Sequence, residues 1–291
     1  AVSVTPPRMT AAEVAKVLRV PGPQDDKYTR GVVQLATGSD TYPGAAVLGV
    51  EGALGSGPGV VRFSGARQSE RMVLDKFPEV VLNTGRFECA VIGSGWDEGR
   101  LPLAEDLIAA SLKQGETVAP VVVDAGALEH APRWSSTGTP LILTPHLGEA
   151  RRLWNQLQKG RPRAETVPVG AKMATYLAKT VGAIVVLKSS TTWVADPKGL
   201  HSAFESHCGW AATAGSGDVL AGVIGGIVAA NYRAGAILTD VVGAGVWIHA
   251  KAAEQAAGIG QPIRATQIAA HIPNIIGRLL HSGSSDIPSA R

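Results

Sequence analysis

The feature that most constrains the fold is a regular alternation of short apolar runs with longer helical patterns. Most of the apolar runs end in a turn rich in Gly, Ser, Thr, Asp or His. Apolar strands that alternate with helices predict an α/β fold with a mostly parallel sheet and helices on both faces. The strand-like segments are residues 31–40, 59–65, 79–85, 89–95, 119–126, 140–146 and 183–190.

Helical patterns separate several of these strands, and the first of them completes a βαβ unit. Residues 191–205 differ, because two short strand-like pieces flank a turn around Pro197 and Gly199, which predicts a hairpin. The helices expected from periodicity and from glycine stops are residues 42–57, 101–114, 148–158, 219–230, 240–257 and 265–282.

Chain length and organisation favour a single domain. The 291 residues can bury a substantial core, and neither an internal repeat nor a long linker divides them. We therefore expect one domain over residues 1–291, with residues 1–26 as an N-terminal segment and residues 283–291 as a frayed tail.

Composition excludes several functional classes. The net charge is only +3, and the basic cluster Lys159–Arg163 is better explained by a solvated loop than by nucleic-acid binding. Cys89 and Cys208 lack metal spacing, which favours a reducing compartment. The longest apolar run, Val219–Ala230, is only 12 residues long, too short to cross a bilayer. We expect a soluble cytoplasmic protein with neither nucleic-acid nor membrane partners.

The stretch Ala211–Gly222, "AATAGSGDVLAG", carries the strongest chemical signal. Gly215, Ser216 and Gly217 can turn their backbone amides toward one point, at the positive end of the helix that follows. Asp218 beside this anion hole could accept a proton from a hydroxyl while the amides attract a phosphoryl group. The competing interpretation is that Asp218 only caps the helix.

Other polar residues follow the expected strands, where ligands of open parallel sheets gather. His146 ends one strand and Glu149 falls in the next helical turn, although a loop histidine and a helix-dipole carboxylate would also explain them. Lys188 precedes hydroxyl residues that could meet phosphate or ribose oxygens, or it could be a snorkelling lysine. The chain has neither a P-loop nor a Gly-x-Gly-x-x-Gly fingerprint.

Taken in order, these motifs resemble the ADP/ATP-dependent NAD(P)H-hydrate dehydratases of the ribokinase-like superfamily. The resemblance runs from about Lys27 to Ala257 and rests on ordered motifs, of which "TPHLGE" followed by "GSGDVLAG" is the most specific pair. The other motifs are "YPGAA", "ALGSGPGVV", "VIGSG", "VVVDAGAL", "LTPHLGEARRL" and "VVLKSSTTWVA". It implies a three-layer sandwich that dehydrates the S-epimer of hydrated NAD(P)H, with ADP or ATP as co-substrate and Mg²⁺ as cofactor.

The resemblance also implies roles for individual residues. Asp218 would be the catalytic base, and Asp124 and Glu149 would support the site; no metal ligands are indicated. The positions implied for the hydrated dinucleotide are Ala45, Gly95, His146 and Asp218, and those implied for the adenine nucleotide are Lys188, Ser189, Ser190, Thr191, Thr192 and Gly217. A homo-oligomer is implied, together with functional pairing with an NAD(P)HX epimerase.

The sequence departs from the family pattern at several of these motifs. Gly126 stands where a second acid follows Asp124, and Ser216 stands where threonine is common. Ser189 replaces a glycine after the lysine, and Trp96 and Asp97 alter the turn after Gly95. Two alternatives stay open. The same Asp and anion hole would serve a ribokinase-like kinase for a small molecule such as a vitamin precursor, and Gly126 and Ser189 suggest a non-catalytic nucleotide-binding protein.

Overall fold

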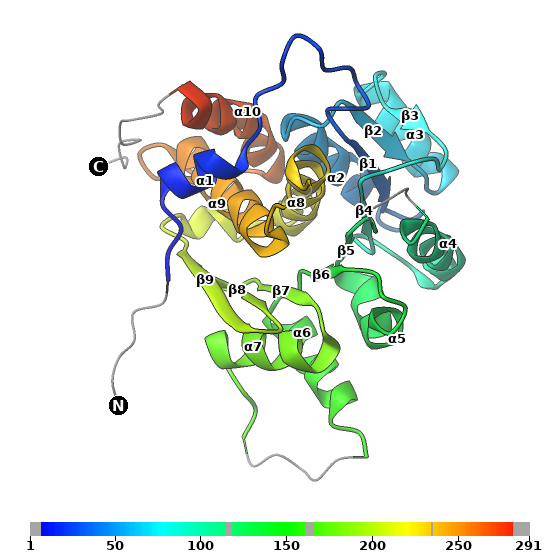
Figure 1. The fold of residues 1–291 in the computed structure, drawn as a ribbon, viewed down its shortest axis with the longest axis vertical. Coiled ribbons are helices and arrows are strands. Elements are labelled where there is room, and N and C mark those ends of the chain that lie inside the picture. Colours follow the sequence, from blue (N-terminus) through cyan, green and yellow to red (C-terminus); the bar gives the residue numbers. More distant parts are fainter. Residues whose placement is uncertain (1–6, 114–117, 161–165, 234, 282–291) are drawn as a thin grey trace.

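A nine-stranded sheet forms the middle layer of the protein (Figure 1). The computed structural model describes residues 7–113, 118–160, 166–233 and 235–281. The strand order is β3-β2-β1-β4-β5-β6-β7-β8-β9. Strands β1 to β7 are parallel to one another, β8 is antiparallel to β7, and β9 is antiparallel to β8. The strands are β1 Val32–Ala36, β2 Val60–Phe63, β3 Val81–Leu82, β4 Cys89–Ile92, β5 Val121–Val123, β6 Leu141–Leu143, β7 Ile184–Leu187, β8 Thr191–Asp196 and β9 Gly199–Glu205.

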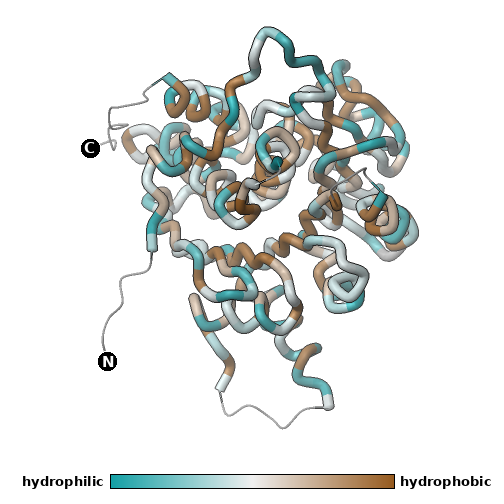
Figure 2. The backbone as a smooth tube through the Cα atoms, viewed as in Figure 1, coloured by the Kyte–Doolittle hydropathy of each residue, from teal (hydrophilic) through white to brown (hydrophobic). Residues whose placement is uncertain are grey.

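Helices cover both faces of the sheet, because side chains alternate along each strand and both faces are apolar. Figure 2 shows apolar residues, in brown, along the strands in the middle of the fold. Val33 and Leu35 of β1 belong to one core, whereas Val32 and Ala36 belong to the other. The first core contains α1 Ala11–Val17, α2 Gly44–Gly55, α3 Arg67–Lys76, α8 Ser216–Asn231, α9 Leu238–Ala257 and α10 Ala265–His281. The second contains α4 Leu101–Ser111, α5 Ala131–Ser135, α6 Leu147–Leu157 and α7 Gly170–Val181. Short 3₁₀-helices are η1 Glu98–Arg100, η2 Ala125–His130 and η3 Gly209–Ala211.

The expected sheet, its two helical layers and the hairpin are confirmed. The hairpin turn is held by Asp196, whose carboxylate accepts hydrogen bonds from the amides of Lys198 and Gly199. Helices α1, α3, α5 and α7 were not expected from the sequence. The expected frayed tail, residues 283–291, lies outside the described residues, as do residues 161–163 of the basic cluster and residues 1–6 of the N-terminal segment.

The strand order reverses beside β1, which places a ligand crevice there. The chain runs from β1 to β2 and β3 in one direction and from β4 to β9 in the other. In such sheets the connections leave on opposite faces at the reversal and open a crevice beyond the carboxyl ends of the strands. Helix α8 packs against β1, β4 and β5 and begins at this end of the sheet.

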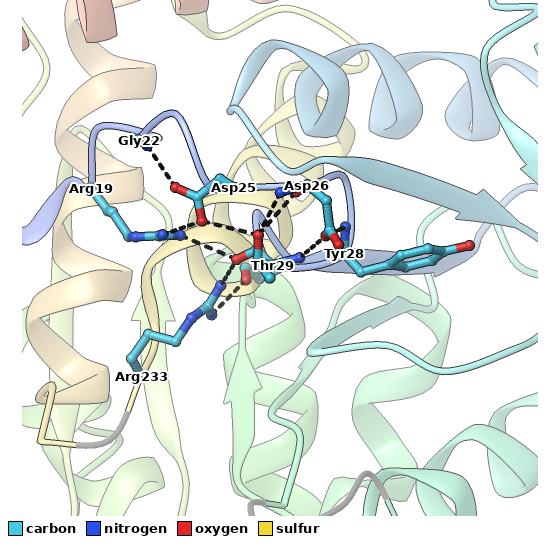
Figure 3. A network of polar contacts seen from close by, with 8 residues as sticks. Arg19, Gly22, Asp25, Asp26, Tyr28, Thr29 and Arg233 are labelled. Carbon is cyan, nitrogen blue, oxygen red and sulfur yellow. Dashed lines mark hydrogen bonds and ion pairs between the residues drawn. The ribbon is translucent and has the colours of Figure 1, made fainter.

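The opposite, amino end of the sheet is closed by a network of polar contacts (Figure 3). Arg19 pairs with Asp25, which also accepts a hydrogen bond of 2.6 Å from the amide of Gly22. The Thr29 carbonyl accepts hydrogen bonds from both Arg19 (3.2 Å) and Arg233 (2.9 Å). These contacts fasten the segment between α1 and β1 to the residues that follow α8.

In the part of the chain that the structure describes, no helix combines the length and the hydropathy needed to cross a bilayer.

Candidate active site

Helix α8 presents its N-terminus and Asp218 at the carboxyl end of the sheet. Gly215 is the N-cap, and its φ of +87° is a conformation that favours glycine. Asp218 lies in the first turn and is not the cap, so the capping interpretation is wrong. Its carboxylate has no hydrogen-bond partner among the described residues. The small residues of α8 let it approach α2 closely: a Cβ at Gly222 would lie 2.0 Å from the Gly49 carbonyl oxygen.

The anion hole expected from Gly215, Ser216 and Gly217 needs a correction at Ser216. The Ser216 amide donates a hydrogen bond of 3.2 Å to the Thr213 carbonyl, because the chain makes a tight turn before α8. The Gly217 and Asp218 amides make no backbone hydrogen bond to described residues. The Gly215 amide makes no such bond to a described residue either, so Gly215, Gly217 and Asp218 have the amides available for an anion, and Ser216 does not.

A buried ion pair joins the ends of β5 and β7. Lys188 Nζ lies 2.9 Å from Asp124 Oδ1, and Asp124 is 2 % exposed. Asp124 also accepts hydrogen bonds from Ser94 (2.8 Å) and Thr144 (2.7 Å). Burial by itself would raise the pKa of Asp124, but the Lys188 charge and these hydrogen bonds hold that pKa below its usual value. Lys188 is therefore not a snorkelling surface lysine.

The Lys188 ammonium also borders the N-terminus of α8. A Cβ at Gly217 would lie 3.2 Å from Lys188 Nζ, so glycine at this position leaves room for the ammonium group. Burial by itself would lower the pKa of Lys188, but Asp124, together with Glu149 and Asp218, raises it. Lys188 therefore remains a cation beside the free amides.

Asp218 has the electrostatic properties of a proton acceptor near neutral pH. Burial raises its pKa to about 6, and the negative charges of Asp124 and Glu149 act in the same direction. The Lys188 charge opposes them. A carboxylate with this pKa is largely ionised at pH 7 yet basic enough to take a proton from an activated hydroxyl.

His146 and Glu149 form a capping box at the start of α6. Glu149 Oε2 accepts a hydrogen bond of 2.7 Å from the His146 amide, and His146 Nδ1 accepts one of 2.9 Å from the Gly148 amide. Nδ1 is thus an acceptor, and Nε2 of the neutral ring carries the proton. Half of the His146 side chain stays exposed. Both residues have the structural role that the alternative interpretations gave them, and His146 Nε2 lies 3.4 Å from Glu149 Oε1.

A cavity of about 570 Å³ lies between β7 to β9 and α8 and α9. Five of the six residues expected to bind the nucleotide line it, namely Lys188, Ser189, Ser190, Thr192 and Gly217. His146, expected to contact the dinucleotide, and Ser216 of the expected anion hole line the same cavity. Its apolar wall includes Phe204, Leu220, Val246 and Ala253. Thr191 instead lines a separate hollow with Trp193, because successive residues of β8 point to opposite faces. The hydroxyl of Ser189 already donates to the Thr191 carbonyl.

Ala45 and Gly95, expected to contact the dinucleotide, lie together outside this cavity. Gly95 has a φ of +66°, and a Cβ there would lie 2.5 Å from the Ala45 Cβ. The two departures at Trp96 and Gly126 also meet: a Cβ at Gly126 would lie 3.2 Å from the Trp96 Cβ. The Trp96 indole donates to the Ala36 carbonyl at 2.9 Å and ties the end of β4 to the end of β1.

Three residues of this site were not expected from the sequence. Ser94 and Thr144 fall within the motifs "VIGSG" and "LTPH", but nothing in the sequence indicates that both bind Asp124. His249 lies within an apolar helical run, without any motif, and lines the cavity.

Comparisons with known proteins identify the family of the chain. A family model described as NAD(P)H-hydrate dehydratase matches residues 33–274. The ADP-dependent (S)-NAD(P)H-hydrate dehydratase of Xanthomonas campestris is 31 % identical over 294 residues, covering 94 % of this chain and 97 % of that protein. The bifunctional NAD(P)H-hydrate repair enzyme Nnr of Mycobacterium tuberculosis is 41 % identical over 237 residues, covering 77 % of this chain and 46 % of that protein. The chain thus spans about half the length of its mycobacterial relatives.

A solved structure extends the agreement to the fold. The ADP/ATP-dependent NAD(P)H-hydrate dehydratase of Bacillus subtilis, co-crystallised with ATP/Mg²⁺, superimposes with a TM-score of 0.77 and 25 % identity. The alignment covers 95 % of this chain and all of that one (100 %). The ribokinase-like three-layer architecture expected from the sequence is confirmed, and the chain belongs to the NAD(P)H-hydrate dehydratase family.

Proposed function

We propose that this protein dehydrates the S-epimer of hydrated NADH or NADPH and uses ADP or ATP as the phosphoryl donor. The observation that carries the proposal is the position of Asp218. Its carboxylate is free of hydrogen bonds from described residues, has a pKa of about 6, and adjoins the unpaired amides of α8. The nucleotide would occupy the cavity beside Lys188, and the hydrated ring would approach from the side of Ala45 and Gly95.

The proposed chemistry turns a poor leaving group into a good one. Asp218 takes the proton of the ring hydroxyl while that oxygen attacks the terminal phosphorus, and the bond between this phosphorus and the bridging oxygen breaks. The Gly217 and Asp218 amides and the Lys188 ammonium stabilise the charge on the transferred group. The electron pair of the ring nitrogen then expels phosphate, and loss of a ring proton restores the dihydropyridine. ADP would leave as AMP, and ATP as ADP.

The charge of Lys188 is a necessary part of this scheme. Asp124 holds the ammonium at the carboxyl end of β7, and Ser94 and Thr144 hold Asp124. The cation therefore faces the cavity with little freedom to reorient, so its electrostatic effect on a phosphoryl group costs little reorganisation.

Mg²⁺ would bind together with the nucleotide phosphates. Within the described ranges, no group of three or more His, Cys, Asp and Glu residues could hold a metal ion. The oxygens of Asp124 are engaged by hydrogen bonds and Glu149 already binds His146, which leaves Asp218 as the nearby carboxylate without a hydrogen bond from a described residue. This donor set fits a cation that keeps several waters and arrives with the phosphates. Bound there, Mg²⁺ would neutralise charge that develops during phosphoryl transfer.

The cellular setting is part of the same proposal. We place the protein in the cytoplasm, as a homo-oligomer that works with an NAD(P)HX epimerase, since the dehydratase accepts one epimer only. The bifunctional names of the mycobacterial relatives support this pairing. Light scattering on the purified protein tests the oligomer, because a monomer mass would contradict it.

The decisive experiment is an absorbance assay near 340 nm, where reduced nicotinamide absorbs and its hydrate does not. The protein is mixed with hydrated NADH, Mg²⁺ and either ADP or ATP. A nucleotide-dependent rise in absorbance is expected, and the active nucleotide identifies the donor. A flat trace from folded protein with both nucleotides would reject the dehydratase. A screen of alcohol substrates would then test the kinase, and nucleotide binding without turnover would indicate a non-catalytic protein.

A further inference from the structure

His249 projects from α9 into the wall of the cavity, at the point where α8 begins. It lines the cavity and is 9 % exposed. Its Nε2 lies 3.1 Å from the Ser216 carbonyl oxygen and 3.5 Å from the Ser216 hydroxyl. One imidazole nitrogen, Nε2, is therefore hydrogen-bonded to the first residue of α8.

The Ser216 carbonyl fixes the tautomer of this ring. A carbonyl oxygen only accepts hydrogen bonds, so Nε2 must carry the proton, and Nδ1 of the neutral ring is an acceptor. Burial lowers the pKa of His249 to about 4, and the nearby Lys188 charge lowers it further, against the effect of the Ser216 hydrogen bond. The ring is thus neutral at pH 7.

The second nitrogen, Nδ1, has no partner in the described part of the chain. It is also not enclosed, unlike Nδ1 of His271, which is both unpaired and fully buried. Because His249 lines the cavity, an accessible and unpaired acceptor of a buried residue borders the space where the nucleotide would lie. Phe204, Leu220 and Val246 give this part of the cavity an apolar character suited to a nucleoside.

We propose that His249 recognises the nucleoside half of the bound nucleotide. Nε2–H donates a hydrogen bond to the Ser216 carbonyl, and Nδ1 accepts a hydrogen bond from a donor of the nucleoside. Two groups supply that chemistry, the adenine amino group and a ribose hydroxyl. The inference rests on the proposed function only in taking the cavity as the nucleotide site.

Two substitutions separate the two nitrogens. In His249→Gln the side-chain amide reaches the Nε2 position and still donates to Ser216, but no acceptor remains at the Nδ1 position. In His249→Asn an acceptor remains near Nδ1, but the side chain is too short to reach Ser216. His281→Gln is the matched control, because His281 is exposed at the end of α10.

The experiment is titration calorimetry of wild type and variants with four probes: ADP, 2′-deoxy-ADP, 3′-deoxy-ADP and IDP, in which an oxo group replaces the adenine amino group. Wild type is expected to bind one of the three analogues about tenfold more weakly than ADP, and that analogue identifies the donor. His249→Gln should bind ADP about tenfold more weakly and lose the discrimination, whereas His249→Asn and His281→Gln should keep it.

The proposal is overturned if wild type binds all four nucleotides equally, or if folded His249→Gln discriminates among the nucleotides as fully as wild type does. Calorimetry does not depend on turnover, so this result stands apart from the dehydratase assay. Discriminating binding with a flat trace at 340 nm would reject the proposed function and support the role of His249. Turnover by the wild type, with unaltered discrimination among the nucleotides in His249→Gln, would support the proposed function and reject the role of His249.

Discussion

The two ends of the sheet carry polar networks of opposite character. At the carboxyl end, the Asp124–Lys188 pair is buried, and Asp218 beside it has no partner among the described residues. At the amino end, Arg19 and Asp25 are joined in a partly exposed pair whose remaining groups bind backbone amides and carbonyls (Figure 3). The pKa of Asp218 is raised to about 6, whereas hydrogen bonds from Arg19 and Gly22 lower that of Asp25 to about 2.

This difference separates charges arranged for chemistry from charges arranged for structure. Burial with incomplete pairing keeps Asp218 reactive and makes its ionised form costly in the folded state. Complete pairing near solvent keeps Asp25 ionised and unreactive, with a modest effect on stability. Substitutions at the two ends should therefore differ in size and in sign.

The largest effect is expected from Lys188→Met. This substitution leaves Asp124 buried without its counter-ion and should lower the free energy of unfolding by about 3–5 kcal/mol. Urea denaturation measures the loss, and the double variant Lys188→Met with Asp124→Asn should recover most of it, because no uncompensated charge remains. The exposed Lys179→Met is the control and should stay within about 0.5 kcal/mol of wild type. A wild-type transition for Lys188→Met would show that the pair is not buried in solution.

Asp218→Asn should reduce the dehydration rate by about 10²-fold or more, because it removes the proposed base. Unlike Lys188→Met, Asp218→Asn should raise the free energy of unfolding. The folded pKa lies above the unfolded value of 3.8, so the ionised group destabilises the fold above pH 6, and this penalty disappears below pH 3.8. The variant should therefore gain roughly 3 kcal/mol at pH 7, because the shift from 3.8 to about 6 spans about two pKa units. Near-full activity would remove Asp218 from the mechanism.

The pH profile sharpens the assignment of the base. Because Asp218 acts in its ionised form with a pKa of about 6, kcat/KM should fall as pH drops below 6, approaching tenfold per pH unit. The profile is measured at 340 nm with saturating nucleotide. If kcat/KM is constant between pH 7 and pH 5, Asp218 is not the group that titrates.

Asp25→Asn should have the smallest effect, at the opposite end of the sheet. We expect Tm at pH 7 to fall by about 2 °C or less, with kcat and KM unchanged. The folded pKa of about 2 lies below the unfolded 3.8, so this contribution is present above pH 3.8 and is lost as pH falls through 2. A change in kcat would mean that the two ends of the sheet are coupled.

Much of the architecture could be predicted because it follows from local sequence patterns of apolar and turn-forming residues. Alternating apolar runs indicated the parallel strands, and the turn around Pro197 indicated the hairpin. Helix α7 was missed although Gly182 ends it with a φ of +77°, a stop signal that the sequence does contain. Strand β3 is only Val81–Leu82, shorter than the expected segment 79–85, and it pairs with β2 alone.

The candidate site was predictable in its location and not in its pairing. Asp218, His146 and Lys188 were placed at the ends of strands or at the start of a helix by sequence alone. The partner of Lys188, Asp124, is 64 residues away and was expected only as a supporting residue. The engaged amide of Ser216 also depends on geometry that residue spacing does not encode.

The sequence by itself determined the layers, the end of the sheet that carries the chemistry, and the family, because periodicity and ordered motifs are properties of neighbouring residues. Only the tertiary structure decided which charges are paired, which amides are free and how His249 is protonated. Those properties depend on burial and on groups that the fold brings together from distant parts of the chain, and a pKa responds to both.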